Sequence, residues 1–344
     1  MGSLFAFGLG IGTRATDGRW LEVFYPAPVF KPAARLEEAL RRIVADLSTN
    51  ISIDADAGFL QRLSSALRHA GAVDQADLAD RLVAAAGRTL LTVLTEDSAP
   101  AAAADAYLKL HLLSHRNVLP NQMNLQGIFA VLPNVAWTSE GAIAADELNA
   151  RQLEARIKGR TLTVHGVDKF PRMADYVVPD GVRIADASRV RLGAYVGSGT
   201  TVMHEGLINF NAGALGPNMI EGRISQGVTV GAHSDLGGSA SLMGTLSGGG
   251  TIVISLGEHC LVGANAGSGI PLGNNCTVAA GVYITAGTIV EVIDEFGASV
   301  RTVKARELAG GNDMLFINNS RTGRIECRTN RKAIELNDAL HAHN

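Results

Sequence analysis

The clearest pattern in the chain is a six-residue spacing of aliphatic residues in its second half. The first run consists of Val178, Ile184, Val190, Val196, Val202 and Ile208. The spacing resumes at Leu256 and Val262, slips by four residues, and continues through Leu272, Val278, Ile284 and Val290. Four positions after most of these aliphatic residues stands a small one, such as Ala194 or Cys276.

A period of six fits neither the alternation of a surface strand nor the 3.6-residue period of a helix. It is typical of a parallel β-helix, in which each hexapeptide forms one flat face and a corner. Three faces make a coil of about eighteen residues, and the aliphatic residues of successive coils stack at the ~4.8 Å strand spacing. The pattern predicts a mainly β protein with a β-helix over residues 171–295, preceded by an α/β domain (1–170) and followed by a small segment (296–344).

Two interruptions of the spacing predict departures from the prism. We expect Asp235–Gly250 to form a loop that leaves it, and the residues around Gly267-Ser268-Gly269 to form a smaller departure. Loops on repeat scaffolds usually lie on the binding face. Beyond the repeats, Val300–Val303 and Leu315–Ile317 are predicted strands, and Lys332–His341 is a predicted helix.

The first 170 residues have the mixed pattern of an α/β region. Strands are expected at Phe5–Gly10, Trp20–Tyr25 and Leu125–Trp137, with a turn over Gly10–Gly18. We interpret Gly8, Gly10 and Gly12 as turn glycines, because the spacing of a nucleotide-binding loop is incomplete. Helical periodicity covers Ala33–Leu47, Phe59–His69, Ala76–Ala86 and Ala101–Arg116.

Composition narrows the function classes. The net charge is −3, from 30 basic and 33 acidic residues, so nothing indicates nucleic-acid or membrane binding. No apolar run is long enough to span a bilayer, and Met1–Gly10 lacks the basic region of a signal peptide. Three cysteines are too few for a disulfide framework and lack zinc-site spacing. We therefore expect a cytoplasmic protein with small, buried cysteines.

The repeats are interrupted by three distinctive strings: MHEGLINFNAGALG (203–216), IEGRISQGVTVG (220–231) and GTLSGGG (244–250). With these strings the chain resembles the tetrahydrodipicolinate N-succinyltransferases, and within them the branch found in actinobacteria and pseudomonads. The resemblance runs in order from Val167-Asp168-Lys169-Phe170-Pro171 to Gly287, and is weaker toward both ends. Hexapeptides alone would indicate only the wider acyltransferase superfamily, whereas the first string is far more specific.

The resemblance implies a left-handed parallel β-helix and a homotrimer whose active sites lie between neighbouring prisms. It also implies an enzyme of lysine and diaminopimelate biosynthesis. Such enzymes transfer succinyl from succinyl-CoA to the amine of L-2-amino-6-oxopimelate, the opened form of tetrahydrodipicolinate. They have no permanently bound cofactor, although the resemblance leaves open a Mg²⁺ or Ca²⁺ ion on the trimer axis with ligands unknown.

Acyl transfer to an amine requires a deprotonated amine, donors for the tetrahedral oxyanion, and two substrates held close together. The resemblance assigns the central role to Glu205. Its carboxylate could act as a general base on the amine, or could attack the thioester and form a mixed anhydride. His204 is the rival base, and we expect the two side chains to point to opposite sides if they lie on a strand.

Five further residues in the matching strings are candidates for binding the substrates. Backbone N–H groups near Gly222 could serve the oxyanion. Arg223 could bind a substrate carboxylate through its planar fork, although it could equally be a surface arginine. Asn209, Asn211 and Ser225 could hydrogen-bond the amino-keto acid or the succinyl carboxylate, or could only support turns.

The resemblance also places the pantetheine arm of coenzyme A. Its amides would pair with backbone near the later coils. The residues concerned are Ser247, Gly248, Gly263, Ala264 and Asn265. Lys304 could meet a phosphate as a point charge, or could be a solvated lysine.

Three alternatives remain at this level. One is an acetyl-CoA-dependent acyltransferase of the same fold. Another is a metal hydratase of the γ-carbonic-anhydrase type, which would need His204, His233 and His259 as zinc ligands. The third is a β-helix scaffold without catalytic activity. We otherwise expect His233 and His259 to support loops or to stack on a face.

Overall fold

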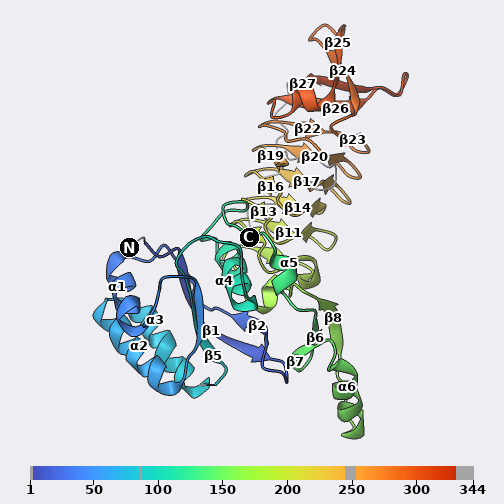
Figure 1. Ribbon diagram of the computed structural model, residues 1–344. Helices are drawn as coiled ribbons and strands as arrows, with labels where there is room; N and C mark the ends of the chain where they lie inside the picture. Colours follow the sequence, from blue (N-terminus) through green and yellow to red (C-terminus); the bar gives the residue numbers. More distant parts are fainter. Residues whose placement is uncertain (1–2, 86, 245–252, 331–344) are drawn as a thin grey trace. The chain divides into compact units, whose positions relative to one another are not determined.

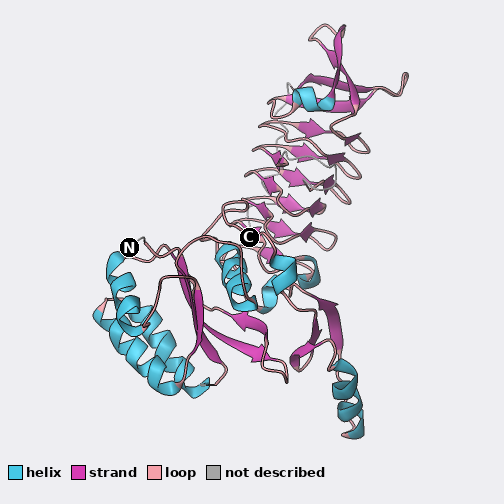
Figure 2. Ribbon diagram, viewed as in Figure 1, coloured by secondary structure: helices cyan, strands magenta, loops and turns pink. Residues whose placement is uncertain are grey.

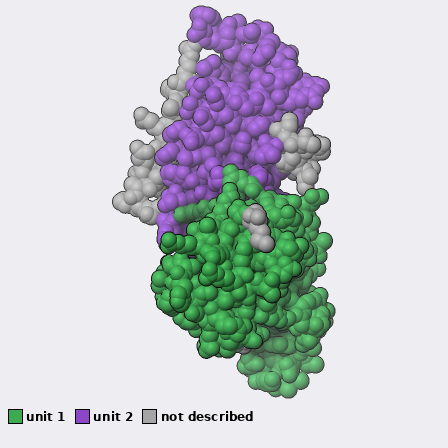
Figure 3. Space-filling model, turned by 60° about the vertical axis from the view of Figure 1, so that its left-hand side comes forward, with its two compact units in different colours: residues 1–118, 122–171 green, residues 119–121, 172–344 purple. Residues whose placement is uncertain are grey.

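The computed structural model describes residues 3–85, 87–244 and 253–330 of the chain. It divides into two compact units, one made of residues 1–118 and 122–171 and the other of residues 119–121 and 172–344 (Figure 3). Among the described residues, no helix has the length and apolarity needed to cross a membrane.

The first unit is built on an antiparallel sheet in the order β2-β1-β5-β4, with β3 added to β1 (Figure 1). Its strands are β1 (Ala6–Arg14), β2 (Trp20–Phe24), β3 (Val29–Phe30), β4 (Ile51–Asp54) and β5 (Thr89–Leu94). The predicted strands at both ends of the first turn are therefore confirmed. The turn itself is shorter than expected, because β1 runs on to Arg14.

The interpretation of Gly8, Gly10 and Gly12 as turn glycines is wrong. All three lie inside β1, where a Cβ atom on Gly8 would approach the Tyr25 ring to 2.6 Å and one on Gly10 would approach it to 2.8 Å. The buried Tyr25 ring therefore lies against a strand that must lack side chains at these positions.

Four helices lie where the periodicity predicts them (Figure 2). They are α1 (Ala34–Ile43), α2 (Ala57–His69), α3 (Val73–Leu82) and α4 (Ala103–Ser114). The first three share one apolar core with the sheet, in which Leu40 and Leu63 meet Phe7 and Val93. A 3₁₀ turn, η1 (Val83–Ala85), follows α3.

The predicted strand over Leu125–Trp137 is wrong in its first half. Residues Ile128–Val131 form a short helix, α5, and only Val135–Thr138 is a strand, β6. Pro133 between them cannot donate a ladder hydrogen bond and disfavours helix in the residue before it, so the apolar run is divided. Strand β6 lies between β7 (Gly141–Ala144) and β8 (Val164–Asp168), and α6 (Leu148–Ile157) connects these two.

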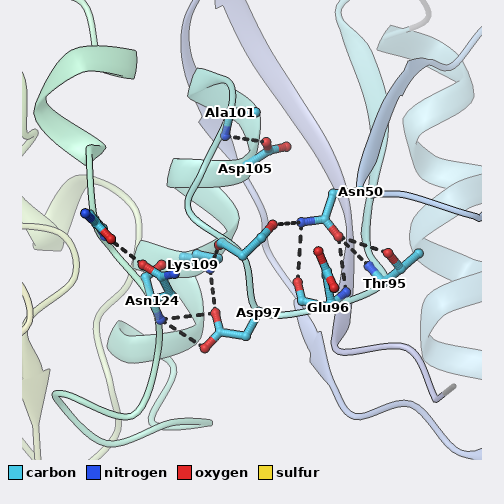
Figure 4. Close-up of polar contacts among 10 residues, drawn as sticks. Asn50, Thr95, Glu96, Asp97, Ala101, Asp105, Lys109 and Asn124 are labelled. Carbon is cyan, nitrogen blue, oxygen red and sulfur yellow. Dashed lines mark hydrogen bonds and ion pairs between the residues drawn. The ribbon is translucent and has the colours of Figure 1, made fainter.

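An ion pair of a fully buried lysine with a partly exposed aspartate ties α4 to the loops beside it (Figure 4). Lys109 is fully buried, and its Nζ lies 2.6 Å from Asp97 Oδ1. The same ammonium donates to the carbonyls of Ser98 and Asn124. Asp97 in turn accepts from the backbone N–H of Asn124. The charge is thus both paired and hydrogen-bonded, which is the condition for burying a lysine.

The second unit is a parallel β-helix of two-residue strands arranged on three faces (Figure 1). The first face carries β9 (Arg183–Ile184), β11 (Thr201–Val202), β14 (Met219–Ile220), β17 (Asp235–Leu236), β20 (Leu261–Val262) and β22 (Thr277–Val278). The second carries β12 (Leu207–Ile208), β15 (Arg223–Ile224), β18 (Ser241–Leu242), β21 (Gly267–Ser268) and β23 (Tyr283–Ile284). The third carries β10 (Tyr195–Val196), β13 (Gly213–Ala214), β16 (Thr229–Val230) and β19 (Ser255–Leu256).

The registers explain the six-residue spacing. Ile184, Val202 and Ile220 are Cα partners on the first face, each eighteen positions from the next. Val202 and Ile220 are fully buried, so the aliphatic member of each hexapeptide stacks inside the prism. The parallel β-helix is confirmed, while its left-handedness stays a prediction. Val178, the first member of the run, is 64% exposed and precedes the first strand of the prism.

The loop predicted for Asp235–Gly250 begins later than expected. Residues 235–236 and 241–242 are strands β17 and β18, with Leu236 and Leu242 buried in the prism. The spacing was hidden because the coil shortens after Ile220, where the next inward residue, Ile224, comes four positions later instead of six. The extra residues of this coil lie between β18 and β19, and residues 245–252 are outside the described part of the chain.

The departure predicted around Gly267-Ser268-Gly269 is also wrong. Gly267 and Ser268 form β21, which pairs with β18 and β23. Ser268 takes the inward position that an aliphatic residue holds elsewhere, and its hydroxyl donates to the carbonyl of Ile270. A polar residue at a core position interrupted the hydrophobic pattern without interrupting the fold.

The segment after the coils belongs to the same unit. Strands β24 (Ile289–Ile293), β25 (Ser299–Lys304), β26 (Met314–Asn318) and β27 (Ile325–Thr329) continue the first face. Both predicted strands are confirmed, and β26 pairs in parallel with β22. The predicted helix over Lys332–His341 lies outside the described residues.

All three cysteines are free and buried, as expected of small core residues. Burial raises the pKa of the Cys327 thiol to about 11, so this residue stays protonated at neutral pH.

Candidate active site

One edge of the prism carries five of the predicted site residues, namely Glu205, Gly222, Gly263, Ala264 and Asn265. It is the row of turns that lead from the first face to the second, and we call it the Glu205 edge. Its turns comprise residues 203–206, 221–222, 237–240, 263–266 and 279–282. Parallel stacking therefore places residues that are sixty positions apart in sequence along one line.

The turn at Glu221-Gly222 has two residues where its neighbours have four. It stands between the turn that carries Glu205 and the turn that carries Ser239. Gly222 is required here, since a Cβ atom on it would lie 2.5 Å from the carbonyl oxygen of Ala240. The short turn thus packs its backbone directly against the turn of the next coil.

Glu205 is exposed on the turn between β11 and β12 and is held at two points. Arg189 Nη2 donates to its backbone carbonyl at 2.7 Å, and Ser239 Oγ donates to its Oε2 at 3.2 Å. The first contact comes from η3 (Ala187–Arg189), which precedes β10. The second comes from the coil that follows the short turn.

A second carboxylate lies beside that of Glu205. A Cβ atom added to Gly238 would be 3.6 Å from Glu221 Oε2 and 3.9 Å from Glu205 Oε2. Both oxygens are therefore within 4 Å of a single point next to the backbone of Gly238. Glycine leaves this point unoccupied.

His204 is the other exposed residue of the Glu205 turn. The expectation that His204 and Glu205 point to opposite sides assumed a strand, and that assumption is wrong because both residues lie in the turn. The contacts from Arg189 and Ser239 distinguish Glu205 from its neighbour.

Arg223, Ser225 and Asn209 lie on or beside the second face. Arg223 is exposed, and its Nε donates to Ser241 Oγ at 2.9 Å. Ser225 is half-buried just after β15. Asn209 Oδ1 accepts from its neighbour's backbone N–H and from Arg191 Nη1 at 3.2 Å. In sequence, each of these three polar residues comes shortly after a turn of the Glu205 edge.

Asn211 has a different environment from the other candidates. It lies on a turn with φ of +51°, and its side-chain amide exchanges hydrogen bonds with Asn121. Asn121 also donates to the carbonyl of Gly227 in the next coil. The Asn211 side chain is thus used to attach residues 119–121 to the prism.

The residues predicted for the pantetheine arm divide into three groups. Gly263, Ala264 and Asn265 occupy the fourth turn of the Glu205 edge, where Ala264 and Asn265 are exposed. Ser247 and Gly248 lie outside the described residues. Lys304 is exposed at the end of β25, which is not part of this edge.

His233 and His259 stack on another edge, between the third face and the first. Their rings are 5.0 Å apart and nearly parallel, at 3°. The two rings therefore stack as expected, but on an edge of the prism and not on a face. His204 lies on the Glu205 edge instead, so the geometry does not unite the three histidines that a hydratase would need. In the described parts of the chain, no group of three or more His, Cys, Asp or Glu residues could hold a metal ion.

Sequence reasoning missed Arg189, Glu221 and Ser239. The signal for Ser239 was present in the inward residues Leu236 and Leu242, because a serine three positions after the first of them must lie in a turn. The proximity of Arg189 and Glu221 to Glu205 follows only from the register in which the coils stack.

A prism of two-residue parallel strands whose inward residues recur every six positions is typical of the hexapeptide-repeat proteins. The comparisons narrow that class. Residues 253–286 match the family described as "Hexapeptide repeat of succinyl-transferase", and residues 132–172 match "Tetrahydrodipicolinate N-succinyltransferase middle".

Curated relatives match over nearly the whole chain. The chain is 57% identical over 342 residues to the 2,3,4,5-tetrahydropyridine-2,6-dicarboxylate N-succinyltransferase of Pseudomonas aeruginosa, covering 99% of both chains. It is 53% identical over 340 residues to the enzyme of that name from Vibrio cholerae, also with 99% coverage of both. The chain belongs to the tetrahydrodipicolinate N-succinyltransferase family.

A solved structure agrees with this assignment. A Campylobacter jejuni protein described as a 2,3,4,5-tetrahydropyridine-2-carboxylate N-succinyltransferase superposes with a TM-score of 0.88 at 31% identity. The match covers 97% of this chain and 94% of that one. The family resemblance inferred from the repeat interruptions is confirmed.

Proposed function

We propose that the chain transfers the succinyl group of succinyl-CoA to the amine of L-2-amino-6-oxopimelate, the opened form of tetrahydrodipicolinate. This reaction belongs to lysine and diaminopimelate biosynthesis. The observation that carries the proposal is the 57% identity to a tetrahydropyridine-dicarboxylate N-succinyltransferase across 99% of both chains. The Glu205 edge supplies a site where the reaction could take place.

Glu205 is the group that we assign to the chemical step. As a general base, its carboxylate takes a proton from the substrate ammonium, and the free amine attacks the thioester carbon. The tetrahedral intermediate then collapses, the carbon–sulfur bond breaks, and coenzyme A leaves as a thiolate, which becomes the thiol by taking up the proton that the attacking nitrogen loses. The amide product carries the succinyl group.

The carboxylate also supports a covalent route. Glu205 would attack the thioester carbon, coenzyme A would leave, and a mixed anhydride would remain on the side chain. The amine would then attack the succinyl carbonyl and release the carboxylate. Mass spectrometry after incubation with succinyl-CoA alone separates the routes, because only the second adds the mass of a succinyl group to the peptide that contains Glu205.

We assign substrate carboxylates to Arg223, whose guanidinium is exposed beside the Glu205 edge and matches carboxylate geometry. Asn209 and Ser225 would bind polar groups of the same substrates, and backbone N–H groups near Gly222 would serve the oxyanion. Asn211 is a weaker candidate, because its amide is bonded to Asn121.

Coenzyme A would follow the later turns of the Glu205 edge. Ala264 and Asn265 are exposed there, and the small side chain of Ala264 leaves room beside the turn for a pantetheine arm. Ser247, Gly248 and Lys304 stay predictions for the same ligand.

The proposed assembly is a homotrimer, with each active site lying between neighbouring prisms. The flat faces of a single prism offer a shallow surface, so a second prism would complete the binding of two substrates. A Mg²⁺ or Ca²⁺ ion on the trimer axis and a cytoplasmic location are further predictions. Light scattering on the active protein tests the trimer, and an active monomer would overturn it.

A thiol-release assay tests the reaction. Succinyl-CoA and acetyl-CoA are each supplied with and without the amino-keto dicarboxylate. We expect acceptor-dependent thiol release with succinyl-CoA. Faster turnover with acetyl-CoA would favour the acetyl alternative, and acceptor-independent release alone would argue against the proposed transfer.

A further inference from the structure

The Glu205 carboxylate would be poorly ordered without support. It projects from an exposed turn, and a glutamate side chain that becomes fixed loses rotamer entropy. A base or nucleophile acts only when its oxygen is within reach of the reacting atom, so a freely rotating carboxylate would be in position for part of the time.

The structure fixes this turn from both sides. Arg189 Nη2 holds the backbone carbonyl of Glu205 at 2.7 Å, which fixes the turn but leaves the side chain free. Among the residues that the structure describes, one hydrogen bond reaches the carboxylate itself, from Ser239 Oγ to Oε2 at 3.2 Å. This bond leaves Oε1 for the reaction.

Ser239 occupies a backbone position that serine seldom adopts. Its φ is +57°, in the left-handed region that favours glycine and asparagine. The equivalent positions of the next two turns on the same edge are Asn265, at +55°, and Gly281, at +73°. The turn that contacts the Glu205 carboxylate thus carries a hydroxyl where the fold alone would favour Gly or Asn, at some cost in backbone strain.

The short turn explains how the hydroxyl reaches its partner. Glu221-Gly222 lies between the two longer turns and contributes two residues fewer than they do. The Ser239 and Glu205 side chains can therefore meet across a coil that would otherwise separate them.

We propose that Ser239 is a positioning residue, whose hydroxyl holds the Glu205 carboxylate in the orientation needed for succinyl transfer. The inference rests on the proposed function and on the role of Glu205 within it. Ser239 itself would touch neither substrate.

The test replaces Ser239 by Gly, which adopts φ of +57° without strain and removes the hydroxymethyl group that carries the donor. We expect kcat to fall by about tenfold, in line with a lost hydrogen bond to a charged group. KM for both substrates should change by less than about twofold, because a residue that acts through Glu205 affects the reacting state more than binding. Ser239→Asn suits the same backbone and supplies an N–H donor, so it should recover most of the activity.

The control is Ser198→Gly, which removes an exposed turn hydroxyl on another edge and should leave kcat unchanged. The decisive comparison is a double-mutant cycle with Glu205→Gln. If Ser239 acts through Glu205, Ser239→Gly should cause no further loss of kcat in the Glu205→Gln background.

The possible results distinguish a failure of the proposed function from a failure of the positioning role of Ser239. A wild-type protein without succinyl transfer would overturn the proposed function, and a fully active Glu205→Gln variant would overturn the role of Glu205 and this inference with it. If Glu205→Gln is impaired and Ser239→Gly keeps wild-type kcat, only the positioning role is wrong. Additive losses in the double variant would likewise contradict it.

Discussion

Ser239 and Glu205 are 34 positions apart in the chain, yet their side chains are joined by a 3.2 Å hydrogen bond. The relationship follows from stacking: two coils of the prism separate the residues in sequence, and the short turn between them brings their side chains together. The position of the Glu205 carboxylate thus depends on three successive coils. Substitutions in any of these coils are therefore expected to affect kcat.

Gly222 should not tolerate a side chain. In Gly222→Ala the new methyl group would lie 2.5 Å from the carbonyl oxygen of Ala240, so one of the two turns must move. We expect a loss of about 1–3 kcal/mol of stability, as for other overpacked sites, together with a fall in kcat of tenfold or more, roughly what a small misplacement of catalytic groups costs. The matched control is Gly287→Ala, where a Cβ would meet nothing within 4 Å. Equal melting temperatures and kcat values for the two variants would contradict the account.

Ala264→Trp should affect one substrate more than the other. Ala264 is exposed on the Glu205 edge, and a large ring there would obstruct the proposed path of the pantetheine arm. We expect KM for succinyl-CoA to rise while KM for the acceptor stays nearly unchanged, measured by steady-state thiol release. The control, Ser198→Trp, places the same ring on a different edge. Equal rises in both KM values would indicate that the coil itself is distorted.

The pair formed by the buried Lys109 and the partly exposed Asp97 should matter to folding of the first unit. Lys109→Met leaves the Asp97 carboxylate, whose side chain is 29% exposed, without its cation, and we expect a loss of about 1–3 kcal/mol, as for a polar group left without its partner. Both tryptophans, Trp20 and Trp137, belong to this unit, so their fluorescence during urea unfolding reports on it. Arg42→Met is the matched control, because its pair with Glu38 is exposed and should contribute less than about 0.5 kcal/mol. Similar losses in the two variants would refute a special role for the pair of Lys109 and Asp97.

His111 should make the first unit sensitive to mild acid. It is fully buried, accepts from Tyr25 N–H and contacts the Tyr107 carbonyl, and burial lowers its pKa to about 3. The unfolded chain takes up a proton below pH 6.5 while the folded state does not, so the stabilisation is present above pH 6.5 and is lost as the pH falls. We expect the free energy of unfolding to drop by about 2 kcal/mol between pH 7 and 5.

The control for that titration is His111→Gln, which keeps polar atoms but does not titrate. Its pH dependence should be weaker without vanishing, because burial also lowers the pKa of His115. An unchanged slope of tryptophan-detected stability against pH would show that His111 is not responsible.

The extent to which sequence could predict this fold depended on which side chains point inward. Val202 and Ile208 are aliphatic and regularly spaced, so the prism was evident, whereas Ser268 is polar and its strand was taken for a departure. The four-residue step from Ile220 to Ile224 shifted the pattern and hid β17 and β18. Local propensity could not show either feature, because both depend on contacts with the coils above and below.

In the candidate site, too, some residues could be predicted from local sequence and others only from the stacking of the coils. Glu205 was found through a specific string of residues, but its partners Ser239 and Arg189 came from registers that no local pattern encodes. Gly8 and Gly10 illustrate the reverse error, since their meaning depends on a tyrosine ring fifteen or more positions away.

The most direct test of the account is the turnover of Glu205→Gln with succinyl-CoA and the amino-keto dicarboxylate. The substitution keeps the size of the side chain and removes its basic, nucleophilic oxygen. We expect kcat to fall by roughly 10²–10⁴, with the melting temperature and the oligomeric state unchanged, because the side chain is exposed and contributes little to the core. His204→Gln should keep most of the activity. Wild-type turnover in Glu205→Gln, together with an inactive His204→Gln, would contradict the account and assign the chemistry to the histidine.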